Sequence, residues 1–244
     1  MKKQSVDSSS PLNTEGINTN FLYLMHIHDS AFPIGSYTQS FGMETYIQSD
    51  DILTKQKLFS FLKAYVSENL LFTDAIFVKE AYEHFQNDDW NAIVRLENIC
   101  DASKNATETR EASKMMGKQF LRGILPVFPD EGLTKWKAAL DNGQVKGHFP
   151  IVYSLYTLKM AFDLFTTILT YLYSSTISLV HNGVRAIPLG QKAGIEIIHK
   201  LIPEIIEAAK KAMNLNLDDL SNHAVGLEIA SMQHAYLHSR LFIS

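Results

Sequence analysis

After about residue 20, apolar side chains recur at intervals of three and four residues along almost the whole chain. Leu58, Leu62 and Tyr65, followed by Leu70, show this spacing clearly. Such spacing places apolar groups on one face of an α-helix, whereas a half-buried strand needs strict alternation, for which we find no convincing segment. The sequence therefore predicts an all-α fold of about seven to ten helices.

Breaks in this pattern indicate loops rather than boundaries between domains. Helix-breaking residues cluster at 125–132 and 141–143, and Pro203 is expected to kink or restart the helix that contains it. A last amphipathic pattern runs from Leu220 to Leu237. Because no linker is long or polar enough to separate domains, we expect residues 21–244 to form a single compact helical domain. The polar residues 1–20 are predicted to be a disordered tail without the apolar core of an export signal.

The composition narrows the class of protein. The chain has 22 basic and 26 acidic side chains, a net charge of −4, without the clustered cations that phosphate binding requires, so we expect no nucleic-acid partner. The single cysteine, Cys100, excludes a disulfide scaffold and indicates a reducing, cytoplasmic location. The uncharged run from Leu164 to Val180 is short for a membrane span and rich in hydroxyls, which favours a buried central helix and no membrane association.

The usual signatures of catalysis are missing from the sequence. Gly117-Lys118 lacks the first glycine of a phosphate-binding loop, since Ala112 stands in that place, and Gln119 replaces the final hydroxyl. His-Glu-x-x-His, Gly-x-Ser-x-Gly and Gly-x-Gly-x-x-Gly motifs do not occur. Nucleotide hydrolysis and zinc proteolysis therefore lose their usual supports, and the motifs identify no catalytic residue and no cofactor.

The histidines of the sequence suggest one alternative function, which is metal binding. His234 and His238 stand four residues apart in the predicted last helix, where both rings would project from one face, and Glu228 could supply a carboxylate. A helical metal-binding protein or metalloenzyme is thus an alternative interpretation, with His234 and His238 as weak candidate ligands. Since no thiol or carboxylate stands at matching spacing, solvated or capping histidines are the simpler interpretation.

Residues 29–46 combine a turn, small residues and aromatics in a way that helix formation does not require. Pro33 and Gly35 predict a fixed bend in the backbone. Small side chains at Ser36, Ser40 and Gly42 would let another element approach closely.

This segment resembles the opening motif of the urease accessory protein UreF family, in which Asp, Pro-Ile/Leu-Gly, an aromatic residue, Ser-x-Gly and Glu follow one another. Here the motif is carried by Pro33, Gly35, Tyr37, Ser40, Gly42 and Glu44. Three further segments are similar to the family in the same order: 110–117, the turn 184–191 with Pro188, Gly190 and Gln191, and the ending 239–244. The resemblance covers about residues 21–244.

The resemblance implies an all-α, generally dimeric protein without its own catalytic centre. UreF proteins act as chaperones in urease maturation. They bridge the accessory scaffold UreD, called UreH in some species, to the GTPase UreG, and the assembly inserts nickel into apo-urease. The expected partners are therefore UreD/UreH, UreG and apo-urease, with a homodimer of the chain itself.

The resemblance also assigns residues to partner binding. Tyr37 and Arg240 match positions implicated together in docking the GTPase, and their neighbours Ser36, Ser239 and Leu241 belong to the same predicted surface. We expect an ordered C-terminal segment to hold Arg240 against Tyr37, with the guanidinium stacking on or bonding to the ring.

Overall fold

The computed structural model describes residues 19–244 as a series of α-helices joined by turns and short 3₁₀ or π segments. The predicted tail lies outside the described residues, except for Thr19 and Asn20, which form a turn. The elements are α1 (Phe21–His28), η1 (Ser36–Thr38), α2 (Met43–Gln48), α3 (Lys55–Ala64), η2 (Tyr65–Leu70), α4 (Asp74–Gln86), α5 (Trp90–Ser103), α6 (Thr107–Ile124), α7 (Glu131–Asp141), α8 (Phe149–Lys159), α9 (Leu164–Ala186), α10 (Gln191–Ala212), η3 (Leu217–Asp219) and α11 (Val225–His234).

The all-α prediction is confirmed, but the predicted number of helices is too low, since residues 19–244 contain eleven α-helices. Two of them, α1 and α2, span eight and six residues, which is too short for a periodic pattern to be recognised. The long apolar segment 151–180 is divided between two helices, because Asp163 caps the start of α9 by accepting a hydrogen bond from the Thr166 amide at 2.7 Å. In contrast, α10 passes through Pro203 as one helix.

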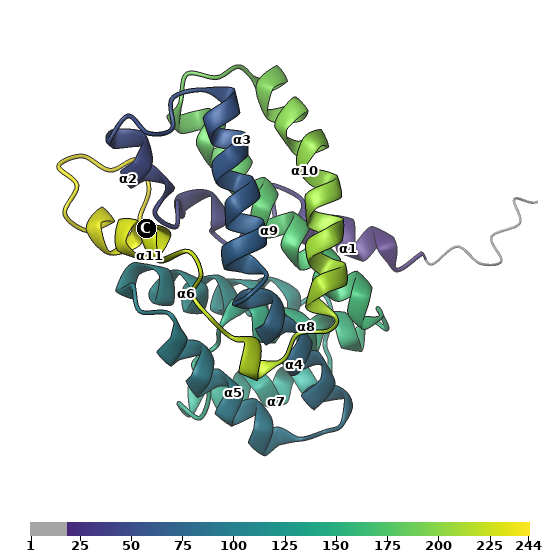
Figure 1. The fold of residues 1–244 in the computed structure, drawn as a ribbon. Helices are drawn as coiled ribbons and strands as arrows, with labels where there is room; N and C mark the ends of the chain where they lie inside the picture. The colour runs from purple at the N-terminus through teal and green to yellow at the C-terminus, as the bar shows by residue number, and fades with distance from the viewer. Residues whose placement is uncertain (1–18) are drawn as a thin grey trace, which may run out of the picture.

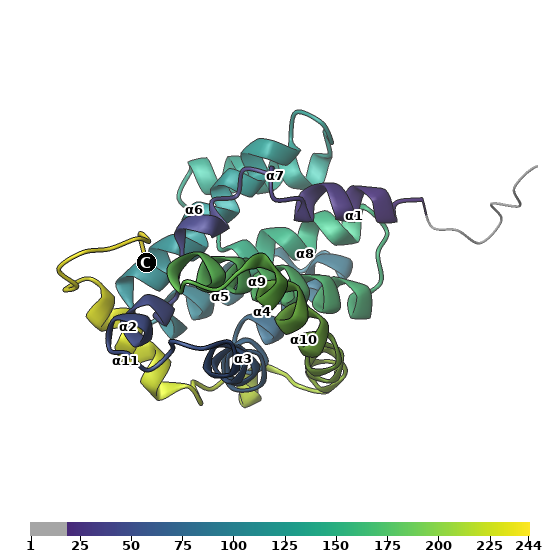
Figure 2. The same cartoon turned by 90° about the horizontal axis from the view of Figure 1, so that it is seen from above.

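Helix α8 lies at the centre of the molecule. Residues 149–157 of α8 are all buried, and α8 packs against α4, α6, α7 and α9. On one side of this centre, α3, α9 and α10 pack together, with α3 and α10 side by side in both views (Figures 1 and 2). The sequence pattern of α3 and η2 is confirmed, since Leu58, Leu62, Val66 and Leu70 are all buried. Within residues 19–244, every helix falls short of the length and apolar character that crossing a bilayer requires.

The predicted last helix is wrong in extent. Of the pattern from Leu220 to Leu237, only Val225–His234 is α-helical, and His238 lies in the irregular segment beyond it. The helix ends at His234 because that side chain is wholly buried between two carboxylates. The chain then turns away to bring its last residues back toward α2 (Figures 1 and 2).

A buried carboxylate fixes the loop before α8. Glu97 accepts hydrogen bonds from the backbone amides of Lys146, Gly147 and His148, at 2.6, 2.9 and 3.1 Å. Burial raises the pKa of Glu97 to about 7, although these three amides act in the opposite direction. The neighbouring His148 is wholly buried and contacts Ser113 and Asp101, and burial lowers its pKa to about 4.

These shifts predict that the folded state weakens on mild acidification. Burial also lowers the pKa of His28 to about 4, so both His28 and His148 favour the neutral form in the fold. Their stabilisation is complete above about pH 6.5 and is lost as the pH falls toward 4, whereas Glu97 gains stability as the pH falls from about 7 to 4.5. For these three groups taken together, two losses against one gain leave a net decrease of about 1–2 kcal/mol between about pH 7 and pH 5. Urea unfolding at the two pH values measures it, and equal or greater stability at the lower pH would contradict the assignment.

Candidate functional site

The motif segment 29–46 folds as a turn followed by two short helices. The Asp29 Oδ1 accepts a hydrogen bond from the Ala31 amide at 2.7 Å, and Gly35 adopts a φ of 81° immediately before η1. The predicted bend at Pro33 and Gly35 is therefore confirmed. The next turn ends at Gly42, with a φ of 84°, and α2 begins at Met43.

Small residues in this segment do permit close packing, as the sequence predicts. A Cβ on Gly42 would lie 2.7 Å from the Ser231 Oγ and 2.9 Å from the Leu227 carbonyl oxygen, so only glycine lets α11 approach α2 this closely. On the other side, the buried Ser36 Oγ accepts a hydrogen bond from the Ser178 Oγ at 3.2 Å. The motif segment is thus held between α9 and α11.

Residues 239–244, which we call the terminal segment, lie along the motif segment. The Ile243 amide donates to the Thr38 carbonyl at 2.7 Å, and the Ser40 amide donates to the Ser244 carbonyl at 2.5 Å. The Phe242 side chain between them is buried. Figures 1 and 2 show α2, α11 and the end of the chain together on one side of the molecule, away from α1. The ordered C-terminal segment predicted from the sequence is present.

Glu44 connects the terminal segment to the body of the protein. Its Oε1 accepts from the Leu241 amide at 2.6 Å, and its Oε2 accepts from the Phe242 amide at 3.1 Å. The same Oε2 lies 2.9 Å from the Nε2 of His234. A buried carboxylate with this many donors is a strong backbone clamp, so the motif glutamate has a definite structural role.

A second carboxylate extends this cluster to Arg240. The Glu108 Oε2, from α6, lies 2.7 Å from the Nδ1 of His234, and the Glu108 Oε1 accepts from the Arg240 Nη1 at 3.0 Å. The charged groups therefore follow one another in the order Glu44, His234, Glu108 and Arg240. We call these four residues the charge cluster.

The expected pairing of Arg240 with the ring of Tyr37 does not occur, because Glu108 takes the guanidinium. The cation beside Tyr37 is Arg185, whose Nη2 donates to the Tyr37 carbonyl at 2.6 Å. The Arg185 guanidinium also lies 4.8 Å from the centre of the Phe242 ring, where a cation–π contact is favourable. Arg185 thus joins the motif segment to the terminal segment. It stands within the motif 184–191, but the family resemblance assigns it no role.

The other predicted residues occupy two kinds of position. Gln48 donates to the carbonyl of Ser239 at 2.7 Å. The side chains of Ser239 and Leu241 are exposed. Ser40 is buried. Pro188 and Gly190 lie between α9 and α10, and Gln191 is the first residue of α10. These three residues do not belong to the charge cluster.

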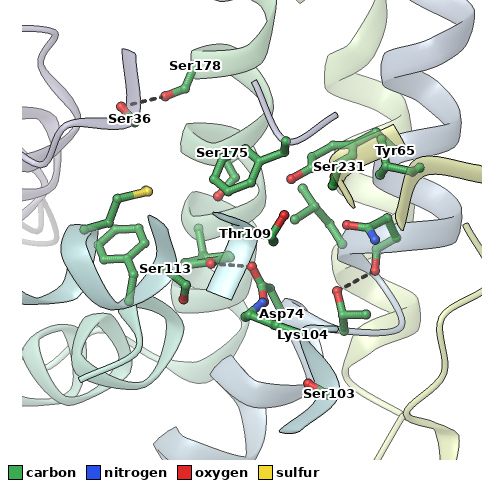
Figure 3. Close-up of a pocket in the computed structure, with 18 of the residues that line it drawn as sticks. Ser36, Tyr65, Asp74, Ser103, Lys104, Thr109, Ser113, Ser175, Ser178 and Ser231 are labelled. Atoms are coloured by element: carbon green, nitrogen blue, oxygen red, sulfur yellow. Dashed lines mark hydrogen bonds and ion pairs between the residues drawn. The ribbon is translucent and has the colours of Figure 1, made fainter. Parts of the chain in front are cut away.

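A small polar cavity lies behind the motif segment, among α4, α6 and α9 (Figure 3). Its volume of about 70 Å³ is lined by several hydroxyls and by the ion pair of Lys104 Nζ with Asp74 Oδ1 at 2.5 Å. Although burial opposes the charge, Asp74 raises the pKa of Lys104. The Tyr171 hydroxyl donates to the other oxygen of Asp74 at 2.9 Å. Lys104, Asp74 and Tyr171 thus satisfy one another at the wall of the cavity.

The metal-site interpretation finds no support in the geometry. His234 and His238 do not share a helical face, because α11 ends at His234 and His238 is exposed beyond it. Both ring nitrogens of His234 already face carboxylates, and Glu228 instead accepts from the Ala106 amide at 2.8 Å. Among residues 19–244, no three His, Cys, Asp or Glu side chains are grouped so that they could hold a metal ion.

The fold and the site together define an all-α protein that displays an ordered terminal segment fastened by a buried charge cluster. Comparison with known proteins shows the family to which the chain belongs. The UreF family model matches residues 52–202. The urease accessory protein UreF of Sporosarcina pasteurii is 50% identical over 202 residues, which are 83% of this chain and all of that relative.

Two more distant relatives match over a longer part of the chain. The urease accessory protein UreF of Lachnoclostridium phytofermentans is 36% identical over 223 residues, and that of Bacillus sp. strain TB-90 is 33% identical over 223 residues. Each match covers 91% of this chain and 98% of the relative. The chain therefore belongs to the urease accessory protein UreF family.

Proposed function

We propose that this chain is a non-catalytic cytoplasmic adaptor that bridges the accessory scaffold UreD/UreH to the GTPase UreG for nickel insertion into apo-urease. Family membership supports the pathway. The observation that carries the adaptor role is the fastening of the terminal segment, whose Leu241 and Phe242 amides are bound by the buried Glu44. A segment held this rigidly presents a preformed surface, which lowers the entropic cost of binding a partner.

The groups that the terminal segment presents suit protein recognition. The Leu241 side chain is 54% exposed and the Arg240 side chain 42% exposed, so an apolar group and a guanidinium stand side by side. The half-buried Tyr37 lies on the motif segment to which residues 243 and 244 bond. Arginine and tyrosine are enriched among the residues that dominate interface energies. We place the GTPase contact on Tyr37, Arg240 and Leu241, flanked by Ser239. The prediction that Ser36 belongs to this surface is wrong, because its side chain is buried against Ser178.

Exposed apolar groups on α11 and in the turn that follows it supply a second surface for the assembly. Val225, Ile229, Met232 and Tyr236 follow one another at helical spacing and are all exposed. Exposure of such a stripe to water is unfavourable, and a partner that covers it gains binding free energy from the burial of apolar surface. Within the proposed adaptor, this stripe and the exposed residues of α1 are available to the scaffold, apo-urease and a second copy of the chain.

Replacing Arg240 with alanine tests the GTPase contact. We expect the helical content to stay unchanged, because the side chain is partly exposed and bonds only to one oxygen of Glu108. The amount of UreG that co-purifies with the chain and UreD should fall by about tenfold or more, as expected when an arginine that supplies much of the binding energy of an interface is removed. Arg122→Ala, which removes another exposed arginine of the chain, is the matched control. Retention of UreG at the wild-type level by Arg240→Ala would refute the docking role.

A further inference from the structure

The imidazole of His234 lies wholly buried between two carboxylates. Its Nδ1 is 2.7 Å from the Glu108 Oε2, and its Nε2 is 2.9 Å from the Glu44 Oε2. An ionised carboxylate can only accept hydrogen bonds, and a neutral imidazole carries a single N–H. While both carboxylates are ionised, both contacts are therefore hydrogen bonds only when the ring holds two protons.

The charges of the cluster lead to the same protonation state. Glu44 and Glu108 contribute two negative charges, and Arg240 contributes one positive charge. With an imidazolium at His234 the charge cluster is neutral, whereas a neutral ring leaves one uncompensated negative charge beside buried groups. A buried charge that has lost its partner destabilises the folded state.

No other charged side chain of the packed elements is bonded to the ring. The remaining ionisable groups nearby have partners elsewhere: Arg110 of α6 donates to the Lys104 carbonyl, and Glu228 of α11 accepts from the Ala106 amide. Glu111 of α6 pairs with Lys114. Glu44 from α2, Glu108 from α6 and Arg240 from the terminal segment are thus the charges that respond to the ring.

We propose that His234 is a proton-dependent fastener of the terminal segment, which is held most firmly while the ring is doubly protonated and is loosened when the ring loses a proton. The two carboxylates that face His234 also bind the segment, since Glu44 accepts from the Leu241 and Phe242 amides and Glu108 accepts from Arg240. Loss of the ring proton leaves these bonds beside an uncompensated negative charge. The consequence for partner docking rests on the proposed function, since the loosened segment would no longer hold Arg240 and Leu241 rigidly. Loosening itself is a property of the isolated chain.

Nuclear magnetic resonance on the full chain tests the fastener without any partner. The imidazole nitrogen shifts of His234 report its protonation, and hydrogen-exchange protection factors report the Leu241 and Phe242 amides over about pH 6 to 9. Protection of both amides should fall by at least about tenfold as the ring loses its second proton. A neutral His234 ring at a pH where both amides remain protected would overturn the proposal, whatever the outcome for UreG binding.

Three variants separate the role of the proton from simple packing. In His234→Gln the protection of the two amides should be lower and independent of pH. In Glu108→Gln the new amide can donate to a neutral ring, so the segment should stay protected over the whole range. His238→Gln, which replaces an exposed histidine close to the segment, should keep the wild-type pH dependence. Unchanged pH dependence in both His234→Gln and Glu108→Gln would also overturn the proposal.

Discussion

Replacing Gly117 with alanine should destabilise the protein by about 3 kcal/mol or more, the range of severe overpacking. A Cβ at this buried position of α6 would lie 2.1 Å from the backbone oxygen of Gly147 and 3.0 Å from the Phe149 amide nitrogen. The Gly147 oxygen cannot easily yield, because it belongs to the peptide whose His148 amide is bonded to Glu97. Alanine would gain only about 1 kcal/mol in helix propensity, so the steric term decides the sign.

Thermal and urea unfolding measure this change. A loss of 3 kcal/mol corresponds to a decrease in Tm of roughly 6–12 °C in a chain of this size. Gly190→Ala is the control, because a Cβ there meets no atom within 4 Å, and its stability should change by less than about 1 kcal/mol. If Gly117→Ala is as stable as Gly190→Ala, the close contact between α6 and the loop before α8 is not present in solution.

Replacing Glu44 with alanine should free the terminal segment and abolish UreG binding. The change removes both acceptors of the Leu241 and Phe242 amides and one of the two carboxylates of His234. The loss of a buried, multiply bonded charge costs about 3–5 kcal/mol. We expect this cost to appear first as fraying of residues 239–244, since the apolar core does not depend on Glu44.

Proteolysis from the C-terminus, circular dichroism and co-purification together measure this effect. Glu44→Ala should be trimmed much faster than the wild type, keep its helical signal and lose UreG. Glu111→Ala is the control, since its carboxylate pairs only with Lys114 on the surface of α6 and should behave as wild type. A terminal segment that resists trimming in Glu44→Ala would show that Glu44 is not its anchor.

Local patterns in the sequence predicted the helices and the backbone of the motif segment. The apolar spacing of α3 and η2 and the bend at Pro33 and Gly35 depend on residues close together in the chain, so periodicity and turn chemistry detect them. The short helices α1 and α2 escaped detection, because fewer than about three turns give no recognisable period.

The charge cluster could not be predicted from local patterns, because its members come from distant parts of the chain. Glu44 and His234 are 190 residues apart, and His234 and Glu108 are 126 apart. Resemblance to the family singled out Glu44 and Arg240 but gave them no partners. The resemblance paired Arg240 with Tyr37. In the fold, Arg240 instead bonds to the carboxylate of Glu108, and Arg185 bonds to the carbonyl of Tyr37.

The affinity of UreG for the assembled complex of this chain with UreD tests the adaptor account most directly. The measurement compares the wild-type chain with one that ends at Ser239, each loaded with UreD and titrated with UreG. We predict that removal of residues 240–244 weakens UreG binding by at least about a hundredfold, the loss of more than one dominant interface residue, while UreD stays bound. Equal affinity of UreG for the two complexes would contradict the account.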